Sequence, residues 1–444
     1  MLYEDKLVPY LYFVFSRADT ERCAFQLGER TRSSLLDEQE HKQATAFLAQ
    51  AKEEIGPALD PELEHLYRSG IAFHHAGLHV QLKAVVERLY EKRLIKVLYC
   101  TSTFALGINM PARAVVFDGL KKYNGQRMAP LTTRQFMQKA GRAGRRGLDE
   151  AGTVILRMDF EDYAEAKPLL TQYLKGTVEP IRSSFNLSWN SIVNLIGQYD
   201  EDTIRDLVDK SFLNWSLSKA AERQRARAET LVESRGANKE VRRLRKRADL
   251  ATGRCWDEFQ AKVGFLKGIG YLDAEGEFCA GAQILQHLQI AEIMMTELVL
   301  SGVLEDLDPP TLFGVLCGLS GDLARHTQCR LPLSKADRRL ARSIAQLYES
   351  KIVVQAEEIS AIAVVWTPPF IPIGRAWIQG TPLHELMDDI SSRTDISGDL
   401  ISCFRRAKDL AGQLRVVYKD FPSQRKILTS LIRKAARDEV EAVG

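Results

Sequence analysis

Five short apolar runs, separated by amphipathic stretches, organise the first part of this 444-residue chain. They lie at residues 11–15, 70–74, 95–100, 114–119 and 152–158. Between the second and third runs, residues 79–93 place Leu82, Val85 and Leu89 on one face of a helix. Apolar runs that alternate with helices in this way predict an α/β fold, in which helices flank a parallel sheet. We expect this domain to occupy residues 1–160.

The rest of the chain is expected to be mostly α-helical. A short strand and turn within residues 266–280 would suit the wing of a winged helix, so we expect such a domain at residues 161–283. Residues 284–444 then predict a carboxy-terminal helical bundle, interrupted by one β-branched run at 359–366.

A charged helical segment occupies about residues 217–260. Basic residues outnumber acids between positions 219 and 249. A long solvated helix is the simplest interpretation, and contact with RNA or with a protein is the alternative. Because the net charge of the whole chain is only +3, any surface that binds nucleic acid must be local.

The seven cysteines are scattered, with no C-x-x-C pair and no metal-ligand spacing. This pattern predicts reduced thiols in a cytoplasmic protein, and no metal site. No apolar run approaches the ~20 residues that a membrane span needs, and the first residues do not read as a signal peptide. We therefore expect no membrane as a partner.

Two loops carry residue types that suit phosphate. The stretch "CTSTFALGINMPA" (100–112) follows a predicted strand and gathers the hydroxyls of Thr101, Ser102 and Thr103. The stretch "QKAGRAGRRG" (138–147) spaces arginines with glycines, so that backbone can approach an anion and guanidinium forks can hold it. Either loop alone is compatible with an ordinary solvated connection. We expect both at the carboxyl ends of strands, where open parallel sheets bind ligands.

Together the loops resemble motifs V and VI of superfamily-two helicases, most closely those of the Ski-two-like (superkiller family) DExH-box RNA helicases. The motif V pattern T-x-T-F-x-x-G-x-N-M-P is matched by Thr101, Thr103, Phe104, Gly107, Asn109, Met110 and Pro111. The motif VI pattern Q-x-x-G-R-A-G-R-R-G is matched by Gln138, Gly141, Arg142, Ala143, Gly144, Arg145, Arg146 and Gly147. The stretches "VFSRADTERCA" (14–24) and "FHHAGL" (73–78) resemble motifs IV and IVa.

The resemblance implies that residues 1–160 form the second RecA-like motor domain of an ATP-dependent RNA helicase that moves 3′-to-5′. The implied catalytic residues, which would read the γ-phosphate, are Gln138, Arg142 and Arg145. The implied nucleotide-binding residues are Gly107, Asn109, Arg142 and Arg145. The implied nucleic-acid-binding residues are Arg17, His75, Gly77, Thr101, Thr103, Arg405 and Arg406. For His75, which follows His74, a structural role is the alternative. Asp149 and Glu150 stand close behind motif VI in the sequence, and we expect these two acids to orient its arginines.

The resemblance continues beyond the motor domain. Residues 183–196 and 209–216 look like the winged-helix entry of this family, and residues 297–312 look like the start of its carboxy-terminal helical (DSHCT-like) domain. Residues 396–414 resemble the helix of that domain that lies along the nucleic-acid path.

That helix departs from the family pattern. Ser397 and Ser402 stand where relatives usually have Glu and Arg, while Arg405 and Arg406 remain. An ordinary bundle helix with a solvated basic face is therefore the alternative interpretation.

In this family ATP and Mg²⁺ are held mainly by a first RecA-like domain, with a G-x-x-x-x-G-K-[ST] loop and a D-E-x-H motif. The chain has no Gly-Lys dipeptide, and no Asp-Glu pair, including those at 37–38 and 257–258, has a His at the fourth position. We therefore expect a portion of a longer helicase. The alternatives are a split-helicase subunit completed by a partner chain and a non-catalytic RNA-binding or adaptor module.

The implied partner is RNA, single-stranded or duplex with a single-stranded tail, with DNA as the alternative strand. The further partners implied are a first motor domain supplied in trans and RNA-decay factors.

Overall fold

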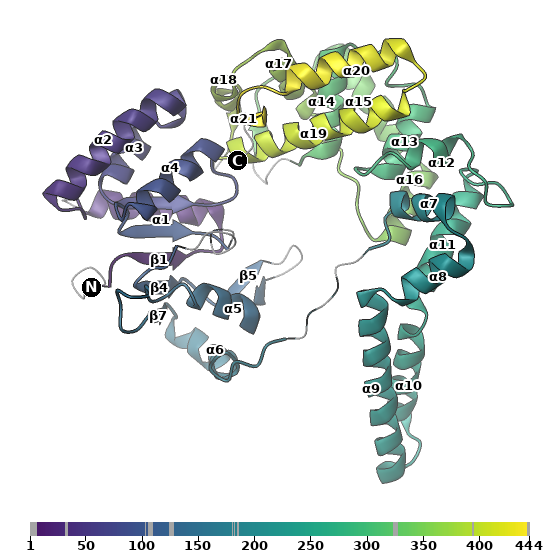
Figure 1. The fold of residues 1–444 in the computed structure, drawn as a ribbon, viewed down its shortest axis with the longest axis horizontal. Helices are drawn as coiled ribbons and strands as arrows, with labels where there is room; N and C mark the ends of the chain where they lie inside the picture. The colour runs from purple at the N-terminus through teal and green to yellow at the C-terminus, as the bar shows by residue number, and fades with distance from the viewer. Residues whose placement is uncertain are drawn as a thin grey trace. The chain divides into compact units, whose positions relative to one another are not determined.

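The computed structural model describes residues 7–31, 34–102, 104, 110–123, 128–179, 181, 183, 186–322, 327–392 and 395–441 (Figure 1). The chain divides into two compact units. The first comprises Met1–Pro180, Ala324–Arg330 and Pro382–Ile401, and the second comprises Ile181–Leu323, Leu331–Thr381 and Ser402–Gly444. This division is coarser than the three domains expected from the sequence, whose boundaries stay a prediction.

The first unit is built on a five-stranded parallel sheet with the order β2-β3-β1-β4-β7. Its strands are β1 (Tyr10–Phe13), β2 (Ile71–His74), β3 (Val97–Cys100), β4 (Ala114–Phe117) and β7 (Thr153–Leu156). Each lies within one residue of a predicted apolar run, which confirms the α/β fold. Because β2, β3 and β4 are buried along their whole length, they read as continuous apolar runs rather than as alternating ones.

Helices cover this sheet (Figure 1). They are α1 (Arg17–Arg30), α2 (Glu38–Ile55), α3 (Pro61–Arg68), α4 (Val80–Glu91), α5 (Thr133–Ala140) and α6 (Phe160–Leu174), with a 3-10 turn at Gly56–Ala58. Side chains of Ser16, Asp37, Asp60 and Thr132 accept the first free N–H groups of α1, α2, α3 and α5. The predicted apolar face of α4 is buried against the sheet.

Short elements complete the first unit. The antiparallel pairs are β5 (Lys121–Tyr123) with β6 (Met128–Pro130), and β8 (Gln328–Cys329) with β9 (Ile390–Ser391). Helix α18 (Leu383–Asp388) and the first turn of α19 (Ser397–Val417) also belong here, because the division between the units falls inside α19.

The second unit is helical in its described part. Its helices are α7 (Trp189–Gln198), α8 (Glu201–Asp209), α9 (Phe212–Arg235), α10 (Lys239–Ala251), α11 (Arg254–Gly268), α12 (Ala280–Leu285), α13 (Glu292–Leu300), α14 (Pro309–Ser320), α15 (Lys335–Tyr348), α16 (Lys351–Ser360), α17 (Phe370–Gln379), most of α19, α20 (Pro422–Ala435) and α21 (Asp438–Glu441). None of the described helices is both long enough and apolar enough to cross a membrane.

Helices α14 and α17 pack backbone against backbone in this unit. A Cβ on Gly314 would lie 2.3 Å from the carbonyl oxygen of Ile371, and a Cβ on Gly374 would lie 2.7 Å from Cα of Gly314. Only glycine permits so close an approach, so these two positions fix how the bundle packs.

Two features noted in the sequence of the second unit can be compared with the structure. The predicted turn within 266–280 is present, since Leu272 and Phe278 form an antiparallel bridge around it. The β-branched run at 359–366 is no strand: α16 ends at Ser360, and the backbone N–H of Val364 donates to the carboxylate of Glu357 rather than to a neighbouring strand. The winged-helix assignment itself stays a prediction.

Candidate nucleotide and nucleic-acid interface

The motif VI loop is fixed to the segment that precedes β4. The N–H of Gly144 donates to the carbonyl of Ala112 at 2.8 Å, and the N–H of Ala112 donates to the carbonyl of Arg142 at 2.9 Å. The loop therefore lies at the amino end of β4, and our expectation of a carboxyl-end position was wrong. The physical reason is that residues 138–147 precede β7, and a loop before a parallel strand opens at that strand's amino end.

Two glycines let the loop lie against the start of β7. Gly144 has a φ of +91°, in the left-handed region that favours glycine. A Cβ on Gly152 would lie 2.3 Å from the carbonyl of Ala143. The close packing on both sides holds the motif VI backbone in one conformation.

Arg145 is held by Asp149, one of the two acids expected to orient the motif VI arginines, whereas the other, Glu150, is exposed. Its backbone N, Nε and Nη2 donate to the Asp149 carboxylate at 2.9, 2.8 and 2.9 Å. The Asp149 side chain is only 5% exposed. Hydrogen bonding to Arg145 lowers the pKa of Asp149 to about 2, so the pair stays ionised across the physiological range.

The implied catalytic residues lie on one short stretch. Gln138 is exposed on the last turn of α5, and Arg142 and Arg145 are half-buried on the loop that follows. Beneath them Lys139 is 2% exposed, and its Nζ donates to the carbonyl of Gln135 at 3.3 Å. Burial lowers the pKa of Lys139 to about 8.

Motif V connects opposite ends of the sheet. Thr101 follows β3 at its carboxyl end, where its N–H donates to the carbonyl of His74 at 3.1 Å. Ala112 precedes β4 at the amino end, beside motif VI. Thr103, Gly107 and Asn109 lie outside the described residues, so their assigned roles stay predictions. The described residues Thr101 and Ala112 thus lie at opposite ends of the sheet.

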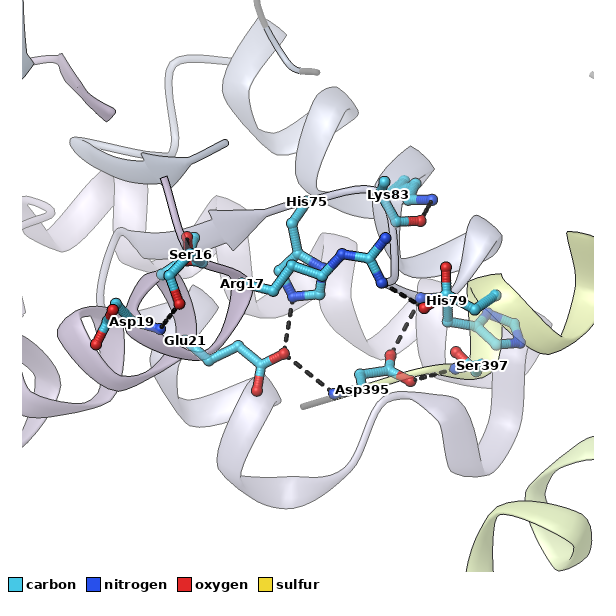
Figure 2. Close-up of polar contacts among 12 residues, drawn as sticks. Ser16, Arg17, Asp19, Glu21, His75, His79, Lys83, Asp395 and Ser397 are labelled. Atoms are coloured by element: carbon cyan, nitrogen blue, oxygen red, sulfur yellow. Dashed lines mark hydrogen bonds and ion pairs between the residues drawn. The ribbon is translucent and has the colours of Figure 1, made fainter. Parts of the chain in front are cut away.

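A nucleic-acid-binding role for His75 requires an exposed side chain, and the structure does not show one. The residue follows β2, and its side chain is fully buried. Its Nε2 is hydrogen-bonded to Oε1 of Glu21 at 2.8 Å (Figure 2). A buried imidazole cannot contact a phosphate, so the geometry supports a structural role instead: His75 positions Glu21.

Glu21 in turn binds the segment before α19. Its Oε1 accepts the backbone N–H of Asp395 at 3.1 Å. The carboxylate of Asp395 accepts the N–H of His79 at 3.1 Å and that of Ser397 at 2.8 Å (Figure 2). Residues from α1, from the loop after β2 and from the start of α19 thus form one hydrogen-bonded network.

Arg17 and Gly77 belong to the same network. Arg17 forms an ion pair with Asp399 in the first turn of α19. Gly77 accepts the N–H of Gly398 at 3.1 Å, and a Cβ on Gly77 would lie 2.7 Å from the carbonyl of Asp395. In this structure both residues therefore contact α19, and their contact with nucleic acid stays a prediction.

Sequence reasoning missed Glu21, Asp395 and Asp399. One signal was available for Asp399, because the Gly-Asp pair in "ISGDL" belongs to the stretch that resembles the family's nucleic-acid helix. No local pattern in the sequence indicates the other two.

Arg405 and Arg406 of α19 differ in their exposure to solvent. Leu400, Phe404 and Leu410 are buried, which sets the outward face of the helix. Arg405 is half-buried, and its Nε donates to the carbonyl of Val440 at 3.3 Å. Arg406 is exposed and lines a cavity of about 370 Å³ in the second unit. Of the two, Arg406 is the better placed to meet a ligand.

The cavity beside Arg406 has polar groups in its wall. The carboxylate of Glu292 accepts the N–H groups of Trp189 at 3.0 Å and of Asn190 at 3.2 Å, at the start of α7. Burial raises the pKa of Glu292. The Oγ of Ser320 is buried and has no hydrogen-bond partner among the described residues.

Metal ligands were not expected from the sequence. In the part of the chain that the structure describes, no group of three or more His, Cys, Asp or Glu side chains could hold a metal ion. All seven cysteines are described, and each is a free thiol.

Two protein families match this chain. Residues 29–147 match the helicase conserved C-terminal domain, and residues 280–442 match the DSHCT (NUC185) domain. The first match ends with the motif VI loop, and the second includes α19.

Curated relatives are similar over about half of the chain. Exosome RNA helicase MTR4 of Mus musculus is 35% identical over 226 residues, which cover 50% of this chain and 21% of that protein. Superkiller complex protein 2 of Homo sapiens is 33% identical over 256 residues, 56% of this chain and 20% of that protein. This chain thus matches about a fifth of the length of each. The chain carries a helicase conserved C-terminal domain followed by a DSHCT domain, and its homologues are Ski-two-like DExH-box RNA helicases.

Proposed function

We propose that this chain supplies the second motor domain and the nucleic-acid channel of an ATP-dependent RNA helicase. The observation that carries the proposal is the motif VI loop. Its backbone is bonded to Ala112, and the Arg145 guanidinium is held by Asp149. An arginine held in place before the reaction loses little freedom when it stabilises charge on a transferring phosphoryl group.

Arg142 and Arg145 act on the γ-phosphate in this proposal, with Gln138 beside them. ATP and Mg²⁺ are held mainly by a first RecA-like domain, whose phosphate-binding loop has no counterpart here because the chain lacks a Gly-Lys dipeptide. When bound, the metal neutralises charge on the phosphates. This chain's own contribution is the pair of arginines and the loop that positions them.

RNA lies at the carboxyl end of the sheet in this proposal. Thr101 meets the phosphate backbone there, and Arg406 meets the strand in the second unit. Contacts to backbone carry little sequence information, so we expect binding of low sequence specificity that weakens steeply with salt. Motif V, which joins Thr101 to Ala112, connects this surface to the ATP side.

The proposal is tested by joining the chain to a first RecA-like domain that carries a phosphate-binding loop. We expect ATP hydrolysis that single-stranded RNA stimulates, and unwinding of a duplex with a 3′ tail but not of one with a 5′ tail. A single-stranded DNA of the same sequence identifies the preferred strand. Absence of hydrolysis from the joined protein, together with intact RNA binding by the chain, would favour a non-catalytic RNA-binding module.

The proposal extends to protein partners and to the location in the cell. The relatives are named as an exosome helicase and a superkiller complex protein, so RNA-decay factors are the proposed protein partners. The first motor domain in trans is the alternative, and RNA-stimulated hydrolysis by a mixture of two separate chains would support it. The cytoplasmic location also stays a proposal.

A further inference from the structure

Helices α9 and α10 form a hairpin arm in the second unit (Figure 1). They pack through Ala228, Val241 and Leu244, which are buried, with Leu231 and Val232 beside them. Gly236 ends α9 with a φ of +67° and begins the short connection to α10. The arm thus has a small apolar core of its own, which fixes the face that each helix turns outward.

The acidic residues of α10 form ion pairs with arginines of α9. Arg225 forms an ion pair with Asp249 at 3.2 Å, and Arg227 forms one with Glu240 at 3.4 Å. Glu240 and Asp249 are the two acidic residues in the sequence of α10. The remaining charges of this helix are therefore all positive.

Four of these positive side chains form a row on the face of α10 opposite the core. Because Val241, Leu244 and Ala248 face inward, a period of 3.6 residues places the opposite positions outward. The row, which we call the α10 stripe, consists of Lys239, Arg242, Arg243 and Lys246. All four are exposed, and none forms an ion pair among the described residues.

The chemistry of the stripe suits a phosphate backbone. Its ends are seven residues apart, which is about 10 Å along a helix and similar to about three successive phosphates of one duplex strand. Arginine forks and lysine ammonium groups both hold phosphate. The sequence of α10 contains no aromatic residue, so it offers no platform on which unpaired bases could stack.

We propose that the α10 stripe is a second nucleic-acid contact, which holds the phosphates of double-stranded or folded RNA. It shares no residue with the motif loops or with α19, so it goes beyond the helicase function proposed above. The duplex is favoured over a single strand because the stripe offers charge without stacking. The simple solvated helix expected for residues 219–249 does not explain why every acid of α10 is turned toward α9.

The test measures binding of the full chain to a fluorescently labelled, blunt 20-base-pair RNA duplex by anisotropy, at several salt concentrations. The stripe variant combines Lys239→Gln, Arg242→Gln, Arg243→Gln and Lys246→Gln. The matched control removes the same charge from α9 by Lys219→Gln, Arg223→Gln, Arg225→Gln and Arg227→Gln. Three of those four side chains already have acidic partners. Far-UV circular dichroism checks that both variants keep their helices.

We expect the stripe variant to bind at least tenfold more weakly at 100 mM salt. We also expect its salt slope to fall by about 3, since each lost phosphate contact contributes about 0.9. The affinity of the control variant for the duplex should fall less than threefold. A charge-preserving pair, Lys239→Arg with Lys246→Arg, should bind like the unchanged chain.

The proposal would be overturned if the stripe variant and the control lost duplex affinity equally, or if neither lost any. Polyglutamate serves as the competing probe. If the unchanged chain binds polyglutamate through the stripe but does not bind the duplex, the surface fits an acidic protein instead. None of these readouts depends on ATP hydrolysis, so they remain informative if the helicase proposal fails.

Discussion

Gly398 donates its backbone N–H to the carbonyl of Gly77 at 3.1 Å, which joins the first turn of α19 to the loop after β2. A Cβ on Gly398 would lie 2.7 Å from the carbonyl oxygen of Leu78 and 3.0 Å from that of Ala76. The start of the helix that resembles the family's nucleic-acid helix is therefore bonded directly to the loop after β2.

Replacement of Gly398 by alanine tests this contact. The added methyl group would overlap three carbonyl oxygens, so we expect the free energy of unfolding in urea to fall by about 1–3 kcal/mol. Gly412→Ala in the same helix is the control, because a Cβ there would meet nothing within 4 Å. That variant should be unchanged or more stable by up to about 1 kcal/mol, since alanine favours helix. Similar behaviour of the two variants would contradict the close approach.

Asp149→Asn should remove a pH-dependent part of the stability. The folded pKa of Asp149, about 2, lies below its unfolded value near 3.9. Its ionised form therefore stabilises the fold fully above about pH 4, and this contribution is lost as the pH falls toward 2. We expect the difference in unfolding free energy between variant and unchanged chain to be largest near pH 6 and to shrink toward pH 3.

The exposed neighbour Glu150 provides the control for that experiment. Glu150→Gln should leave the unfolding free energy nearly unchanged at both pH values, since a surface substitution away from a bonded network has little effect. If the difference in unfolding free energy between Asp149→Asn and the unchanged chain stayed constant from pH 6 to pH 3, the Arg145–Asp149 pair would not be the source of that difference.

Lys139→Met should stabilise the chain at neutral pH. The buried ammonium group has a pKa of about 8, below its unfolded value near 10.4, so the charged form destabilises the fold. We expect a gain of about 2–3 kcal/mol in unfolding free energy at pH 7, which narrows as the pH rises to 10 and the lysine becomes neutral. Lys167→Met, at an exposed position of α6, should show no such narrowing. A loss of stability at pH 7 would mean that the ammonium group is satisfied where it lies.

Most of the sheet was predictable because its signal is local. A strand such as β3, buried on both faces, leaves a continuous apolar run, and α4 leaves a helical period. The side of the sheet on which motif VI lies was predicted wrongly, because the carboxyl-end rule applies to loops that follow strands. The motif VI loop instead precedes the predicted strand at 152–158, so the amino end was the place to expect it.

The network around Asp395 could not be predicted from patterns. Asp395 binds His79 across 316 residues of chain. His79 begins the periodic stretch 79–93, but that pattern gives no indication of a partner near residue 395. The sequence likewise could not decide between a structural and an RNA-facing role for His75, whose side chain is completely buried. Burial and pairing of this kind depend on which loops the fold brings together, and a single sequence does not contain that information.

The central claim is that the motif VI arginines act on ATP, and one rate measurement tests it most directly. In the chain joined to a first RecA-like domain, Arg142→Ala and Arg145→Ala should each lower RNA-stimulated ATP hydrolysis by about 10³-fold or more, because arginine fingers contribute on that order. RNA binding should stay within about threefold, and Arg146→Ala on the same loop should retain most of the rate. Hydrolysis by Arg142→Ala and Arg145→Ala at the unchanged rate would contradict the account.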